Sequence, residues 1–198
     1  GEGSTMYEQA YMSIGKGLRL VFFGEILTTV AGLFSWFGLS LIGLVLTIVG
    51  LGMAGQGDSG YQKAFHVTIL HLAMVFLGVI LTALTLAFMP VLGDVLAALI
   101  VLASAVLAFL SVYYVCATSA ALLENRSNPL SMRADTLWKV YGVCSAVTHA
   151  CALALMLPFL ATMLLAGGIA FFSSIILAVA GVLYIVFLYQ ASEVFLHW

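Results

Sequence analysis

Four ionisable side chains stand inside long apolar segments of the chain, and they are the residues best placed to do chemistry. They are Glu25, His66, His71 and His149. A charged side chain at the centre of a membrane costs ~2.5–3.5 kcal/mol or more, so such groups pair with one another or face a water-filled cavity. We therefore take all four as candidates for a ligand site or an ion path. The alternative is a buried hydrogen-bond network that only fixes helix packing.

The spacing of these residues does not indicate a metal site on one helix. His66 and His71 are five positions apart, roughly 140° around a helix, while His149 and Cys151 point to nearly opposite sides. The pairs HxxxH, HExxH and ExxH, which present two ligands at one spot, do not occur in the sequence. A metal would need ligands from separate helices. The sequence identifies neither a metal nor an organic cofactor.

The serines do not indicate hydrolytic catalysis. Ser145 and His149 share one helical face, but neither Ser145 nor the pair Ser173-Ser174 stands in a GxSxG context. Serine in a membrane helix usually bonds to a carbonyl one turn earlier. We therefore assign no catalytic residue. An intramembrane enzyme ranks third among the functions considered.

Composition places these residues in a membrane. The chain has 198 residues, of which 64% are hydrophobic and 7% charged, and its mean hydropathy is +1.22. Soluble proteins carry about 25% charged residues, and a soluble fold of this size has too little interior to hide so much apolar surface. The net charge of −2 includes no basic block, which argues against nucleic acid as a partner. The partner indicated is the lipid bilayer.

Six segments are long enough to cross a ~30 Å hydrocarbon layer, which takes roughly 20 apolar residues. We predict an all-α, polytopic integral membrane protein with one transmembrane domain, residues 13–196. Residues 1–12 are expected to be a cloning remnant before Met6 and a cytoplasmic lead-in. Turns are expected at Pro90 with Gly93-Asp94 and at Gly167-Gly168, and a kink at Pro158. The six predicted transmembrane helices are residues 13–36, 38–55, 64–89, 95–123, 136–165, and a last helix after Gly168 that ends near residue 196.

The basic residues predict the orientation. All six fall near the start of the first span, between the second and third, or around the link between the fourth and fifth: Lys16, Arg19, Lys63, Arg126, Arg133 and Lys139. By the positive-inside rule these regions are cytoplasmic, so both termini are inside. The links on the other side are very short, which forces antiparallel neighbours. The expected architecture is three sequential helical hairpins.

Small residues recur every seven positions on the first two spans. Gly17, Gly24 and Ala31 follow this spacing on the first, and Gly43 and Gly50 on the second. Such residues let helices approach closely in lipid. We favour packing inside one bundle over a contact with a second copy. Three widely spaced cysteines without CxxC spacing are expected to be free thiols.

Three of the ionisable groups are expected to lie at similar depths in the membrane. Glu25 follows Lys16 by nine residues, His71 follows Lys63 by eight, and His149 follows Lys139 by ten, about 12–15 Å along each helix. We predict that Glu25, His71 and His149 face a common interior, with Glu25 paired to a histidine. The leading function is binding or movement of a small solute or ion. The runner-up is a non-catalytic subunit that packs against a second copy or a membrane partner.

The orientation can be tested by cysteine labelling from outside intact cells. A cysteine at Ser127 should stay unlabelled, and one at Gly93 should react, because the positive-inside rule places them on opposite sides. The reverse pattern would show that the predicted orientation is wrong.

Overall fold

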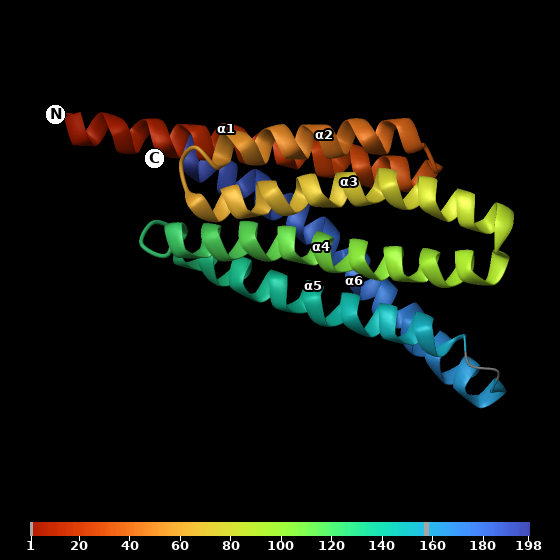
Figure 1. Cartoon of the computed structure of the whole chain (residues 1–198). Coiled ribbons are helices and arrows are strands. Elements are labelled where there is room, and N and C mark those ends of the chain that lie inside the picture. Colours follow the sequence, from red (N-terminus) through yellow and green to blue (C-terminus); the bar gives the residue numbers. More distant parts are fainter. Residues whose placement is uncertain (1, 157–158) are drawn as a thin grey trace.

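The structure, a computed structural model, describes residues 2–156 and 159–198. Its described part forms six α-helices that run up and down in sequence (Figure 1). Their bounds are α1 Glu2–Phe34, α2 Phe37–Ala54, α3 Ser59–Phe88, α4 Pro90–Leu123, α5 Asn128–Ala154 and α6 Leu160–Leu196. The predicted all-α class is confirmed, and the lead-in before residue 13 continues α1 as helix.

Local sequence explains where several helices begin. The Asp58 carboxylate accepts a hydrogen bond from the Gly60 amide at 2.7 Å and so caps α3. Pro90 and Pro129 stand in the first turns of α4 and α5, where the missing N–H of proline has no helical partner to lose. Ser35, with φ of 55°, turns the chain between α1 and α2.

Two predicted turns need correction. Gly167 and Gly168 lie inside α6, which begins at Leu160, because glycine is tolerated in membrane helices and does not by itself end one. Gly93 and Asp94 lie in the first turns of α4, after a single linking residue, Met89. The Pro158 kink falls outside the described residues. Since Gly93 packs against Leu86, the exposed Asp94 is the better cysteine position on this turn.

Within the described residues, five helices are long and apolar enough to cross a membrane: α1, α2, α3, α4 and α6. The exception, α5, carries Arg133, Asp135 and Lys139 in its first half. It nevertheless packs along α4 and α6. These five helices are those of a multi-pass membrane protein. The helix α5 is too polar in its first half to be counted as a sixth apolar span.

Neighbours in sequence form the main contacts of the bundle. The three hairpins α1–α2, α3–α4 and α5–α6 pack most extensively, as predicted, and α1 also packs against α6. Figure 1 shows the α5–α6 hairpin running obliquely, so that its far end lies away from α1 and α2.

The buried core is concentrated at the end of the bundle that holds both termini. We call this the basic end, because all six Lys and Arg residues lie in the half of the bundle nearer to it. Its largest fully buried side chains are Ile14, Leu18, Val21, Leu51, Tyr61, Val115, Cys116, Leu123, Phe187, Leu188 and Phe195. Toward the opposite end few side chains are buried.

Four glycines bring α1 and α2 into backbone contact, and we call them the glycine seam: Gly17, Gly24, Gly43 and Gly50. A Cβ at Gly24 would lie 2.6 Å from the Gly43 carbonyl oxygen, and one at Gly43 would lie 2.7 Å from that of Gly24. The second pair is equally close, with 2.5 Å between a Cβ at Gly50 and the Gly17 oxygen. The heptad spacing therefore serves packing within one hairpin.

We predict that Gly24→Leu damages folding more than Leu27→Ala. The leucine side chain would separate two helices that lipid does not press together, whereas the half-buried Leu27 loses only part of its contacts, about 1 kcal/mol. Thermal unfolding of the purified variants in detergent would measure both changes. A Gly24→Leu variant as stable as Leu27→Ala would show that the seam does not hold the hairpin.

Candidate functional site

Glu25 faces the interior of the bundle from α1. It lies seven residues beyond the fully buried Leu18, on the same helical face, where the packed core ends. Its carboxylate is close enough to the side chains of Tyr141 on α5 and Tyr184 on α6 to interact with them electrostatically. Polar side chains of α5 and α6 therefore lie within electrostatic range of one carboxyl group on α1.

The Glu25 carboxylate forms no hydrogen bond or ion pair with any residue in the described part of the chain. A side chain does bond to the backbone of this residue, since the Thr29 hydroxyl donates to the Glu25 carbonyl oxygen at 2.8 Å. Tyr141 and Tyr184 likewise form no side-chain hydrogen bonds within the described ranges, although Tyr184 is only 3% exposed. The three polar groups therefore lie within electrostatic range of one another without a direct hydrogen bond in the described part of the chain.

A separate set of polar contacts joins α3 to α4. The hydroxyls of Tyr61 and Ser119 are 2.7 Å apart, and those of Thr68 and Ser111 are 3.1 Å apart. Thr68 also donates to the Ala64 carbonyl oxygen. These groups are satisfied, so they act as structural links between the two helices.

The histidines of α3 do not complete a site with Glu25. His71 is half-buried, and His66 is exposed with its ring edge against Phe65. Within the described ranges neither ring forms an ion pair with Glu25. The predicted pairing of Glu25 with a histidine is therefore absent, because their shared depth did not fix the direction of each side chain.

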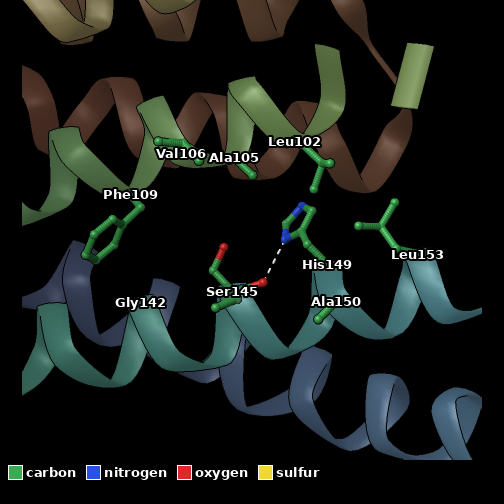
Figure 2. A pocket seen from close by; sticks show the side chains of 10 residues that line it. Leu102, Ala105, Val106, Phe109, Gly142, Ser145, His149, Ala150 and Leu153 are labelled. Atoms are coloured by element: carbon green, nitrogen blue, oxygen red, sulfur yellow. Dashed lines mark hydrogen bonds between the residues drawn. The ribbon is translucent and has the colours of Figure 1, made fainter. Parts of the chain in front are cut away.

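His149 lies in a different place, in a cleft between α4 and α5 (Figure 2). Its Nδ1 is 2.7 Å from the carbonyl oxygen of Ser145, one turn earlier. The cleft has a volume of about 320 Å³, and neither Glu25 nor His71 lines it. The structure thus places His149 in a cleft that the other two residues of the expected polar centre do not line. Whether any of them binds a ligand stays a prediction.

A metal site is not evident in the described residues, which contain no group of three His, Cys, Asp or Glu side chains suited to hold an ion. Cys116 is buried, Cys144 and Cys151 are half-buried, and all three are free.

Arg19 connects α1 to α6 at the basic end. Its guanidinium pairs with Glu193, donates from Nε to the Ser192 hydroxyl at 2.9 Å, and lies 4.7 Å from the centre of the Tyr189 ring. Next to it, Tyr11 stacks on Trp198 with ring centroids 4.1 Å apart. These contacts hold the first and last helices together.

Sequence reasoning did not identify two residues near Glu25. Tyr141 is one of several tyrosines in the sequence, and its ring packs against the buried core. Tyr184 is embedded in an apolar run of α6. A tyrosine within such an apolar run is the sequence feature that could have identified Tyr184, because a buried hydroxyl needs a polar neighbour.

We predict that Arg19→Met lowers stability by roughly 1–2 kcal/mol, because it removes partly exposed charged hydrogen bonds while keeping an apolar stem. The control is Lys139→Met. Lys139 donates to Asp135 at 2.7 Å, and this bond, with a second from Trp138, lowers the pKa of that exposed carboxyl. The Lys139 change should have little effect, since both partners are about half exposed. Thermal unfolding in detergent gives the comparison, and equal losses would contradict it.

Comparisons with known proteins identified no relative of this chain. No protein-family model, curated protein or solved structure matches it.

Proposed function

We propose that this membrane protein binds a small cation inside the bundle, with Glu25 as the charged ligand and Tyr141 and Tyr184 as neutral ones. The observation that carries the proposal is the Glu25 carboxylate, which faces the interior of the bundle on the same face as Leu18 and has no partner among the described residues, while Tyr141 and Tyr184 lie within electrostatic range of it. Under this proposal, the predicted solute or ion is a cation, and its binding site is at Glu25. It leaves His66, His71 and His149 outside the site.

The energetic argument concerns the charge of Glu25. A carboxylate removed from water is stable only when it is neutralised, either by a proton or by a cation. No basic side chain in the described part pairs with it. Glu25 therefore exchanges a proton for an external cation, and two phenol groups supply uncharged oxygen atoms and aromatic faces around that cation.

The position of the packed core supports entry from one side. Leu18 and Tyr61 are fully buried at the basic end, while Glu25 lies beyond this core toward the opposite end. In the predicted orientation, the core separates Glu25 from the cytoplasm. We propose that the cation enters from outside.

The glycine seam weakens the runner-up function. A subunit that packs closely on a membrane partner needs small residues on the face turned to that partner, but these glycines contact each other within the α1–α2 hairpin. That face is therefore already occupied.

The test is proton release on cation binding. Purified protein in detergent micelles with very little buffer receives Na⁺, K⁺ or methylammonium chloride, and a pH indicator follows the solution. We expect at least one cation to release protons from the wild type, because binding converts the neutral acid into a carboxylate–cation pair plus one free proton. Glu25→Gln should release none.

Two further variants sharpen the result. Glu124→Gln is the matched control, since Glu124 is an exposed carboxyl in the link after α4, and it should behave like the wild type. Tyr184→Phe should weaken cation binding roughly 3- to 10-fold through loss of one hydroxyl ligand. If no cation releases protons from the wild type, or if Glu25→Gln releases as many as the wild type, the proposal is wrong.

A further inference from the structure

The His149 side chain has one ring nitrogen fixed by the backbone and one that is free. A carbonyl oxygen only accepts hydrogen bonds, so the contact of Nδ1 with the Ser145 oxygen at 2.7 Å requires Nδ1 to carry the proton. In neutral histidine this leaves Nε2 as an acceptor with a lone pair. Nε2 has no partner in the part of the chain that the structure describes.

Figure 2 shows where this free nitrogen points. The ring projects from α5 across the cleft toward Leu102 on α4, with Nδ1 on the side of Ser145 and Nε2 on the far side. The surrounding side chains are almost entirely apolar. The exception is the Ser145 hydroxyl, so Nε2 is one of two side-chain acceptors in an otherwise apolar cleft.

The walls of the cleft define the shape of a ligand. Small residues from both helices line it, among them Ala105 on α4 and Ala146 on α5. Figure 2 shows Phe109 toward one end of the cleft and Leu153 toward the other. A volume of about 320 Å³ is roughly ten times that of one water molecule. The small residues on both helices leave open space between them, and a flat ring system is a ligand shape that fits such a space.

The mouth of the cleft opens toward lipid. Val106 and Leu153 on its rim are 57% and 41% exposed, and both belong to the apolar surface that a bilayer would cover. A ligand would therefore arrive from the membrane.

We propose that the α4–α5 cleft binds a lipid-soluble aromatic molecule with one hydroxyl group, and that this hydroxyl donates to Nε2 of His149. The hydroxyl supplies the missing donor, and the ring occupies the space between Ala105 and Ala146. This site is separate from the one around Glu25 and does not depend on it.

The test uses 2-naphthol as the probe and 2-methylnaphthalene as its control, since the two have nearly the same shape and only one carries a hydroxyl. Equilibrium dialysis compares nanodiscs that contain the protein with empty ones, which subtracts partition into lipid. The wild type should bind 2-naphthol saturably and roughly 3- to 10-fold more tightly than 2-methylnaphthalene, the effect of one hydrogen bond.

Three variants separate the hydrogen bond from the cavity. His149→Phe should bind both compounds equally, because it keeps a ring and removes the acceptor. Ala105→Phe should weaken binding of both by filling the cleft. His66→Phe is the matched control and should retain the wild-type difference, since His66 is exposed on α3.

A spectroscopic measurement covers the case in which His149→Phe fails to fold. In wild-type protein labelled with ¹⁵N-histidine, 2-naphthol should shift the Nε2 resonance of His149 and 2-methylnaphthalene should not. Absence of saturable 2-naphthol binding, equal affinity of the wild type for the two compounds, or an unmoved Nε2 resonance would each overturn the proposal.

Discussion

The contact between α1 and α6 at the basic end holds the rest of the structure in place. Each hairpin is joined internally by a short link, but only the packing of the first helix against the last closes the chain into a bundle. Arg19 makes this contact specific, because one guanidinium binds Glu193 and Ser192 of α6. Without this contact, α5 and α6 would remain attached to the bundle only through α4. Glu25 would then lose its position beside Tyr184.

The helices and hairpins of the fold could be predicted from the hydrophobicity and charge of the sequence. Long apolar segments and short links predicted the helices and hairpins, since lipid leaves the chain few other solutions. The ends of the helices were harder to predict. Gly167 and Gly168 are typical turn residues in the sequence, but in the structure they lie inside α6. The heptad repeat of Gly17 and Gly24 was informative because close packing requires small residues at regular spacing.

The candidate site was only partly predictable, for a geometric reason. Distance along a helix gives depth in the membrane, whereas the direction of a side chain depends on the rotation and tilt of its helix, which packing sets. Glu25 and His149 have similar expected depths, yet the carboxylate interacts with tyrosines of α5 and α6, and the imidazole faces α4. The packing of α6 also places Tyr184 within electrostatic range of Glu25, and no sequence motif in α6 predicts this position.

The length of α6 links the shape of this protein to the thickness of its membrane. Its 37 residues extend about 55 Å, while the hydrocarbon layer measures only ~30 Å. The helix must therefore tilt, protrude or do both, and its oblique course in Figure 1 is consistent with tilt. Because α6 is fastened to α1 near Ser192, a thicker bilayer would draw its far end upright and a thinner one would let it lean outward. The angle of the last hairpin would then report on the lipids around it.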